Sequence, residues 1–438
     1  MGRDRHREWE VPLRFRFVHA ADLHLDSPLQ ILGARRKDLR ERLVDATLDA
    51  FDAIVLKALD EGAAFVVFAG DLYDGITRGA RAQLRFQAGL RRLSESGIEV
   101  FIAHGNHDPA GGRWNQIREW PRGVFVFPAS TPQTFEVARD GVLLARVHGV
   151  SYGTQKESRN LAARFQGGPG ELDLFRMADV PNVPPVIDVA VLHCNVGGDA
   201  EHESYSPCSL DDLVSRRIDY WALGHIHRHK VLAAGGPWVV YPGCSQGRSF
   251  SPGDQGEKGA VLVEVDAGRV VRVTPFPTDR VRFVEVTCEL DGVADLGALQ
   301  ERLVGMARLE SERHDGREVL MRARIRGRSD LHGEIRSLER REELLAELGR
   351  EPAGLGVQWL ELIDESGPAL DLEALAAGED LRAALIKMAR SWQEGETGLG
   401  VELTRELKSV VGDVSGDELE AVIERSLYEV LERLGEGG

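Results

Sequence analysis

Cysteine is scarce in this sequence of 438 residues, and no CxxC pair occurs. The four cysteines are scattered, at Cys194, Cys208, Cys244 and Cys288. Their scatter favours a reduced compartment over a disulfide framework. Long apolar runs are also missing, since none approaches the roughly 18 to 20 residues that a membrane-spanning helix needs. The charged first residues contain no apolar signal segment, so we expect a cytoplasmic protein without a membrane partner.

Positive charge is in deficit, and the formal net charge is −17. Because Lys and Arg supply most of the energy of non-specific DNA binding, this balance argues against a broad DNA-binding surface. An acidic cluster that binds metal ions would itself contribute negative charge. A basic stretch at residues 78–93 fits a solvated helix face better than a phosphate-binding strip.

Short apolar runs that read as buried strands recur through the first half of the chain. They lie at residues 15–20, 64–70, 98–105, 142–149, 186–194 and 218–225. Helix-length segments separate the first three runs, which predicts a layered α/β domain. After residue 229 the sequence changes to hairpin patterns, which predict a second sheet.

Three domains are predicted from these patterns. The first ends at residue 280, after the sequence PFPTDR. Residues 281–350 read as a small α+β domain, and residues 351–438 as a helical region.

Side chains that bind metals follow the carboxyl ends of the predicted strands. They are Asp22, His24, Asp71, Asp74, Asn106, His107, Asp108, His193, His225 and His227. An open α/β sheet places its ligands at this edge, so we expect these side chains to lie close together. Crowded carboxylates and imidazoles would repel one another or shift their pKa values unless cations neutralised them. The sequence therefore predicts two divalent metal ions about 3.5 to 4 Å apart, with Asp71 as the candidate bridging carboxylate.

The ligand chemistry narrows the choice of metal. Oxygen and imidazole ligands without thiolate favour Mn as the first candidate, with Fe, Zn or Mg as alternatives. Asp-x-His and His-x-His on extended segments would each place both side chains on one face, because the strand period is two. On this reasoning Asp22 and His24 reach into one site, and so do His225 and His227, whereas His229 lies further along.

Five short blocks carry a family resemblance. ADLHLD, GDLYD, GNHD, VLHCN and GHIH resemble, in order, the signature blocks of calcineurin-like metallophosphoesterases, and HAADLHLDSPL is similar to the opening of the SbcD and YhaO-type nuclease subunits. The resemblance implies a four-layer α-β-β-α metallophosphoesterase sandwich, a small α+β capping domain and a helical C-terminal region, residues 351–438, that binds a partner.

The resemblance also implies roles for the residues in these blocks. One metal ion would be held by Asp22, His24, Asp71 and His227. The second would be held by Asp71, Asn106, His193 and His225. His107 would lie beside the scissile phosphate, where it stabilises charge or protonates the leaving oxygen, with Asp108 orienting its ring.

Further residues are candidates for substrate binding. Asp74 either braces its loop or touches the substrate. Tyr73, His148 and Arg248 either meet a phosphate or base, or serve packing and surface roles. Arg324 and Arg326 belong to a row of four arginines, from Arg322 to Arg328, that a strand would place on one face. This row predicts either phosphate contacts or a solvated strand face.

The resemblance points to a metal-dependent DNA nuclease, acting as an exonuclease or endonuclease in double-strand-break repair. Its partners would be DNA and an SMC-like ATPase of the SbcC type, because the chain itself has no GxxxxGK[ST] motif. A homodimer is left open. The alternatives are a small-molecule or cyclic-nucleotide phosphodiesterase and, ranked last, a non-catalytic scaffold.

Overall fold

The computed structural model describes most of the chain. The described residues are 14–30, 43–75, 79–111, 119–129, 131–166, 185–198, 205–314, 317–350 and 356–393, with positions 39 and 41 and parts of 423–434. Residues 1–284 with 314–320 form one compact unit, and residues 285–313 with 321–438 form a second. The predicted helical region at 351–438 thus lies partly outside the described residues.

The first unit contains two six-stranded sheets, and the first sheet is mostly parallel. Its strands, in spatial order, are β12 (Arg269–Pro277), β11 (Gly259–Asp266), β1 (Phe15–Ala20), β2 (Phe65–Ala69), β3 (Glu99–Ala103) and β4 (Val124–Val126). Strands β1 to β4 run parallel, and β11 pairs antiparallel with both β1 and β12. The parallel strands therefore bring the segments that follow β1, β2 and β3 to the same edge.

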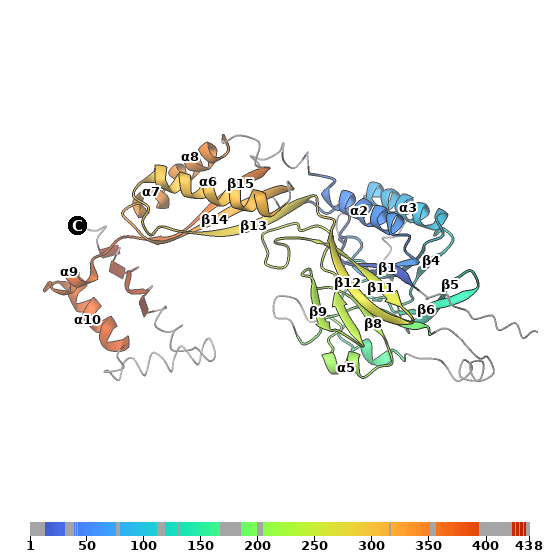
Figure 1. Ribbon diagram of the computed structural model, residues 1–438. Coiled ribbons are helices and arrows are strands. Elements are labelled where there is room, and N and C mark those ends of the chain that lie inside the picture. The colour runs from blue at the N-terminus through green and yellow to red at the C-terminus, as the bar shows by residue number, and fades with distance from the viewer. Residues whose placement is uncertain are drawn as a thin grey trace, which may run out of the picture. The chain divides into compact units, whose positions relative to one another are not determined.

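Helices α2 (Ala46–Asp60) and α3 (Ala80–Glu95) cover the outer face of the first sheet (Figure 1). Helix α2 buries Leu48, Phe51 and Val55, which recur at spacings of three and four and so form one apolar stripe. The Phe51 ring packs 5.1 Å from that of Phe86 on α3. A Cβ at Gly89 would lie 2.4 Å from the Phe51 ring, so this glycine permits the close approach of the two helices.

The second sheet has parallel central strands and antiparallel edges. Its strands, in spatial order, are β5 (Gln133–Arg139), β6 (Val142–Gly149), β7 (Ile187–His193), β8 (Tyr220–Gly224), β10 (Trp238–Tyr241) and β9 (Lys230–Ala233). The hairpin β9–β10 joins this sheet, whereas the hairpin β11–β12 joins the first. The prediction that the hairpins belong to a second sheet therefore holds for β9–β10 but is wrong for β11–β12, because hairpin patterns do not encode the strand that each hairpin joins.

The two sheets pack face to face around an aromatic core. Phe17 of β1 stacks on Phe65 of β2 at 4.6 Å and meets Tyr220 of β8 edge-on at 5.2 Å. The outer face of the second sheet buries Trp221 beneath a loop that carries Phe165. Among the described residues this outer layer is thin, with α5 (Leu210–Val214) and the 3-10 turn η2 (Ala162–Arg164). The predicted α/β class with layers in the order α-β-β-α is confirmed.

A three-stranded sheet carries three helices on one face (Figure 1). Its strands are β13 (Val281–Glu289), β14 (Glu318–Arg328) and β15 (Val357–Gly367), and its helices are α6 (Leu296–Arg313), α7 (His332–Arg336) and α8 (Leu338–Leu348). Strand β15 lies beyond residue 350, where the sequence predicts a helical region. That prediction is wrong for residues 357–367, because a short apolar run such as WLELI does not separate strand from helix by periodicity.

The described C-terminal helices are α9 (Leu372–Ala376) and α10 (Leu381–Gln393). They pack together around Ala376, Ile386 and Leu431. None of the described helices combines the length and the apolar character that a crossing of a membrane requires.

Candidate metal centre

The candidate site lies in the first unit, where the loops after β1, β2, β3, β7 and β8 meet. The first two loops are joined by backbone hydrogen bonds, from the Asp22 N–H to the Gly70 carbonyl and from the His24 N–H to the Asp71 carbonyl, both 3.0 Å long. The main chain therefore fixes three candidate ligands, Asp22, His24 and Asp71, relative to one another.

Four candidate residues have a left-handed backbone. The φ angles are +51° for Asp22, +43° for His24, +52° for Asp71 and +102° for His225. Such angles are uncommon outside glycine and cost roughly 1 to 3 kcal/mol each, so they persist only where the surroundings enforce them. The predicted convergence of these side chains is found, but the reasoning from an extended segment is wrong, because the strands end before these residues.

Three glycines leave the space that the ligands occupy. A Cβ at Gly105 would lie 2.3 Å from Asp71 Oδ1, and a Cβ at Gly70 would lie 2.4 Å from His193 Nδ1. A Cβ at Gly224 would lie 1.9 Å from the Ala69 carbonyl and 2.8 Å from His193 Nδ1. A larger residue at any of these positions would displace His193 or Asp71.

One group of ligand atoms joins Asp22, His24 and His227, all within 4.8 Å of one another. The Nε2 atoms of His24 and His227 are 3.3 Å apart. Nδ1 of His227 lies 2.8 Å from a carboxylate oxygen of Asp254 and is its hydrogen-bond donor, which leaves the Nε2 lone pair directed at His24. Nδ1 of His24 is buried and has no hydrogen-bond partner among the described residues.

A second group joins Asp22, Asp71 and His193, and all three side chains are buried. Nδ1 of His193 donates to the Ala69 carbonyl at 2.9 Å, so the Nε2 lone pair points the other way. It faces the Asn106 side-chain oxygen at 3.0 Å and a carboxylate oxygen of Asp71 at 3.4 Å. Three hydrogen-bond acceptors this close together are stable only if a cation or a proton lies between them. These side chains are therefore suitable ligands for a divalent metal ion.

Electrostatics in the site reflect burial and close pairing. Burial raises the pKa of Asp22 to about 6 and lowers that of His24 well below its ordinary value. Burial alone would lower the pKa of His193, but the Asp71 carboxylate outweighs it and raises the value to about 9. The pKa of Asp71 is lowered despite burial, because His193 lies beside it. Without a cation, a proton on His193 therefore offsets the negative charge of the buried carboxylates.

His225 lies beside the second group. Its backbone N–H donates to a carboxylate oxygen of Asp22 at 3.0 Å, and its ring meets the His193 ring at 5.3 Å. The Tyr205 ring packs against it from another side at 5.6 Å. The predicted ligand roles of His225 and Asn106, and the bridging role of Asp71, stay predictions.

His107 stands next to the first group, with its ring 5.0 Å from that of His24. Its side chain is 41% exposed, so a substrate can reach it. Nδ1 lies 2.9 Å from a carboxylate oxygen of Asp74. This hydrogen bond raises the pKa of His107 and lowers that of Asp74 to about 2.

The structure corrects the predicted role of Asp108. Its carboxylate accepts backbone hydrogen bonds from Gly105, Asp71 and Leu72, at 2.8 to 3.2 Å, and lies 3.1 Å from His104 Nδ1. Asp108 therefore braces the loops after β2 and β3, and Asp74 rather than Asp108 orients the His107 ring. Adjacency in sequence was misleading, because the side chains of neighbouring residues diverge.

Asp74 and Arg248 form an ion pair in the site. The second carboxylate oxygen of Asp74 accepts from Nη1 of Arg248 at 3.1 Å. Arg248 is 14% exposed in its side chain, and its Nε is buried without a hydrogen-bond partner among the described residues. Both remain candidates for contact with a substrate.

For Tyr73 and His148 the structure supports the packing alternative over contact with a substrate. Tyr73 is fully buried in the core, with its ring 5.8 Å from that of Phe86. His148 is also buried, and its two ring nitrogens contact Thr134 and Asp188, both at 2.8 Å. Packing and structural hydrogen bonds therefore explain both residues.

The arginine row on β14 is paired with carboxylates from the flanking strands. Arg324 donates to Glu285 of β13 at 2.9 Å and also contacts Glu365 of β15. Arg326 donates to Glu365 at 2.6 Å. Because neighbouring glutamates neutralise these arginines, the structure favours the solvated strand face over phosphate contacts.

Asp254 contacts the predicted metal ligand His227, and the sequence did not reveal it. It stands 27 positions after His227 in a Ser, Pro and Gly-rich turn, without any motif around it. The signal available in the sequence is an acidic residue in a loop that also carries Arg248.

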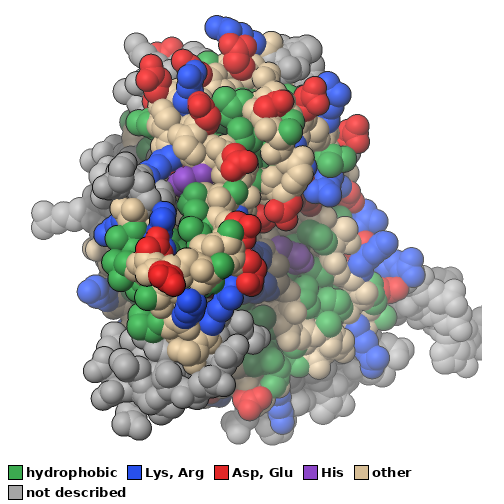
Figure 2. Space-filling model, turned by 90° about the vertical axis from the view of Figure 1, so that its left-hand side faces the viewer, with side chains coloured by type: hydrophobic (Ala, Val, Ile, Leu, Met, Phe, Trp, Pro, Cys, Tyr) green, Lys and Arg blue, Asp and Glu red, His purple; other side chains and the backbone are tan. Residues whose placement is uncertain are grey.

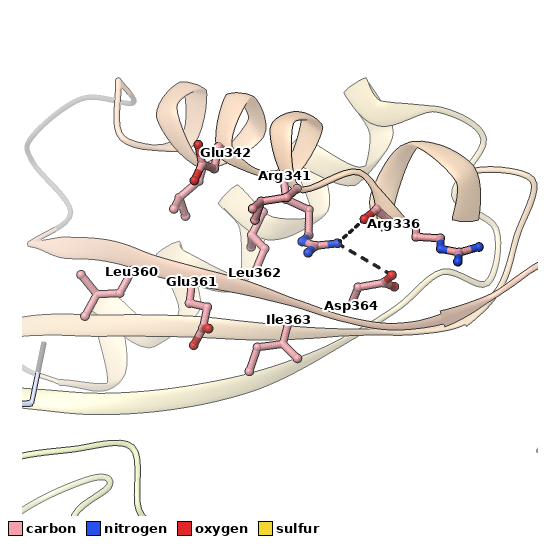
Figure 3. A pocket seen from close by; sticks show the side chains of 10 residues that line it. Arg336, Arg341, Glu342, Leu360, Glu361, Leu362, Ile363 and Asp364 are labelled. Atoms are coloured by element: carbon pink, nitrogen blue, oxygen red, sulfur yellow. Dashed lines mark hydrogen bonds and ion pairs between the residues drawn. The ribbon is translucent and has the colours of Figure 1, made fainter. Parts of the chain in front are cut away.

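A pocket of about 480 Å³ lies in the second unit, between α8 and β15 (Figure 3). Arg341 crosses it to the Arg336 carbonyl at 3.0 Å and approaches Asp364 at 3.8 Å, above the apolar floor of Leu360 and Leu362. Its charged side chains interact with one another, so this pocket does not resemble the metal centre as a candidate ligand-binding site.

Comparisons with known proteins agree with this geometry. Residues 15–229 match the calcineurin-like phosphoesterase family, and residues 283–364 match the middle domain of the metallophosphoesterase YhaO. The chain is 37% identical over 254 residues to the uncharacterized metallophosphoesterase YhaO of Bacillus subtilis. The aligned residues make up 58% of each chain.

Two further relatives carry names from DNA metabolism. The DNA double-strand break repair protein Mre11 of Halobacterium salinarum is 39% identical over 302 residues, or 66% of each chain. The SbcD component of the nuclease SbcCD of Bacillus subtilis is 25% identical over 255 residues, or 54% of this chain and 63% of the relative. The chain thus spans about three fifths of the curated relatives' length. Residues 15–229, which contain the loops that meet in the metal centre, are therefore a calcineurin-like metallophosphoesterase domain, of a family of hydrolases that act on phosphoester bonds.

Proposed function

We propose that this chain hydrolyses phosphodiester bonds in DNA with two divalent metal ions, of which Mn is the first candidate. One observation carries the proposal. Two groups of candidate ligand atoms lie close together: His193 Nε2 is 3.0 Å from the Asn106 side-chain oxygen and 3.4 Å from an Asp71 carboxylate oxygen, and His24 Nε2 is 3.3 Å from His227 Nε2, with Asp22 shared between the two groups.

The chain's own residues would hold the metal pair and the substrate. Asp22, His24 and His227 would hold one ion, and Asn106, His193 and His225 the other, with Asp71 between them. When bound, such a pair polarises the phosphate and activates water for in-line attack.

His107 is suited to act on the departing oxygen. The Asp74 carboxylate holds its Nδ1, so Nε2 is the atom that can deliver a proton or a hydrogen bond to the substrate. The same hydrogen bond raises the pKa of His107, which keeps the ring protonated nearer neutral pH. Arg248, on the other oxygen of Asp74, would bind a phosphate oxygen.

DNA as the substrate is supported by the relatives named for break repair and nuclease activity. A partner is supported by the name of the SbcCD nuclease, in which the matching relative is one of the subunits. We propose an SMC-like ATPase as this partner and DNA repair as the setting.

A small-molecule phosphodiesterase is the second candidate, and the charge distribution favours it. The arginine row of β14 is neutralised, and acidic and basic side chains are interspersed over the face shown in Figure 2. Such a surface offers fewer unpaired cations to a long polyanion than a nuclease groove does.

Hydrolysis of end-labelled single-stranded and double-stranded DNA with Mn²⁺ tests the proposal. Wild type should shorten DNA, whereas Asp71→Ala and His107→Ala should not. His229→Ala is the matched control, because this exposed histidine lies two positions after His227 and bonds the Tyr241 carbonyl. Cleavage of bis-p-nitrophenyl phosphate without any effect on DNA would support the second candidate instead.

A further inference from the structure

Asp254 lies on the loop at residues 242–258, which connects β10 to β11, and it is 6% exposed. Its two carboxylate oxygens have different partners. Oδ1 contacts Nδ1 of His227 at 2.8 Å. Oδ2 accepts from the Ser249 hydroxyl at 2.9 Å and from the Arg248 backbone N–H at 3.3 Å. One buried carboxylate thus touches a metal-ligand candidate and the residue that carries a phosphate-binding candidate.

The contact with Oδ1 selects one tautomer of His227. An ionised carboxylate only accepts hydrogen bonds, so Nδ1 carries the proton and Nε2 keeps its lone pair. That lone pair faces His24 Nε2 at 3.3 Å, within the group that includes Asp22. Histidines that bind metals commonly donate their other N–H to a carboxylate in this way, which fixes the ring and strengthens the ligand.

The loop is built to hold Asp254 in place. Its backbone N–H donates to the Ser251 carbonyl at 2.8 Å, and a Cβ at Gly247 would lie 2.1 Å from the Asp254 carbonyl. The Lys258 ammonium bonds the carbonyls of Gly253 at 2.5 Å and His227 at 3.3 Å. These contacts join the loop to the His227 segment, so the carboxylate is placed independently of any ligand.

We propose that Asp254 is a positioning residue that sets the tautomer and the ring orientation of His227, and thereby the affinity of one of the two metal sites. Through Oδ2 it also fixes the main chain from which Arg248 reaches Asp74. The inference rests on the proposed two-metal function, and it assigns a role to a residue outside every signature block.

Binding of Mn²⁺ to the metal-free full-length protein tests the inference, with the free ion measured by its electron paramagnetic resonance signal. Wild type should bind two ions. Asp254→Asn keeps the shape but removes the charge, so one of the two affinities should fall about 10- to 100-fold while the other is unchanged. Ser249→Ala is the matched control, because it removes a partner of Oδ2 and leaves the His227 contact, and both of its affinities should stay close to wild type.

A second measurement reports the tautomer directly. Nitrogen NMR of the Zn²⁺-loaded protein, labelled with ¹⁵N-histidine, should show a proton on Nδ1 of His227 and metal on Nε2. If the Asp254→Asn variant fails to fold, this spectrum of the wild-type protein still tests whether His227 has the expected tautomer. Metal on Nδ1, or a proton on Nε2, would overturn the inference.

The two proposals fail differently. If the wild-type protein binds no Mn²⁺, there is no metal centre, and both the proposed function and the proposed role of Asp254 are refuted. If the wild-type protein binds two ions and the Asp254→Asn variant binds both with the same affinities, only the proposed role of Asp254 is refuted. A lower melting temperature of that variant with unchanged metal affinities has the same meaning.

Discussion

Replacement of Gly105 by alanine should damage the metal centre with little effect on the rest of the fold. The added Cβ would lie 2.3 Å from Asp71 Oδ1 and 2.9 Å from His193 Nε2, whereas ordinary contacts begin at 3.4 Å. Asp71 would therefore have to move by about 1 Å, a displacement that can cost about 100-fold in rate. Overpacking of this kind also costs about 1 to 3 kcal/mol of stability.

The assay combines Mn²⁺ stoichiometry, hydrolysis of bis-p-nitrophenyl phosphate and thermal unfolding. Gly105→Ala should bind fewer ions, lose about two orders of magnitude in kcat/KM and remain folded at about 25 °C. Gly305→Ala in helix α6 is the control, because no atom lies within 4 Å of its added Cβ. Two ions bound at wild-type affinity and an undiminished rate in Gly105→Ala would refute the argument from close packing.

Three further predictions concern charge. Metal binding at about pH 7.5 should release about one proton per chain, because the raised pKa of His193, about 9, keeps the metal-free ring protonated; equal calorimetric heats in buffers of different ionisation enthalpy would contradict this. Asp74→Asn should lower kcat about 100-fold or more with little change in Mn²⁺ affinity, since it weakens the hold on His107; an unchanged kcat would exclude that role. Arg326→Glu should leave the salt dependence of DNA binding unchanged, because Glu365 already neutralises this arginine. If the slope of the logarithm of the binding constant against the logarithm of the salt concentration falls in magnitude by about one, Arg326 contacts a phosphate.

The strands and most candidate ligands were predictable because their signals are local. A short apolar run ends, and a carboxylate, an imidazole or an amide follows within a few residues, as at Asp71 after β2 and His193 at the end of β7. Parallel pairing then brings such ends together, whatever lies between them in the chain.

Partners of these residues were not predictable, because they come from distant segments. Asp254 is 27 residues from His227, and the glutamates that neutralise the β14 arginines come from β13 and β15. Proximity in sequence also misled, since Asp108 turns toward the loop backbone while Asp74, 33 positions before His107, holds that histidine. Sequence spacing limits which faces side chains share, but the pairing of loops decides which atoms meet.

The left-handed residues link the metal centre to the stability of the fold. Asp22, His24, Asp71 and His225 each adopt a backbone that costs roughly 1 to 3 kcal/mol, so hydrogen bonds between the loops must offset several kcal/mol in the metal-free protein. The Asp22 carboxylate supports this by accepting the His225 N–H, while its own N–H bonds the Gly70 carbonyl. A metal ion bound between these side chains would stabilise the same strained loops, because it binds only their folded arrangement. The loops that the sequence reveals most clearly are therefore also the part of the first unit whose stability should depend most on the metal.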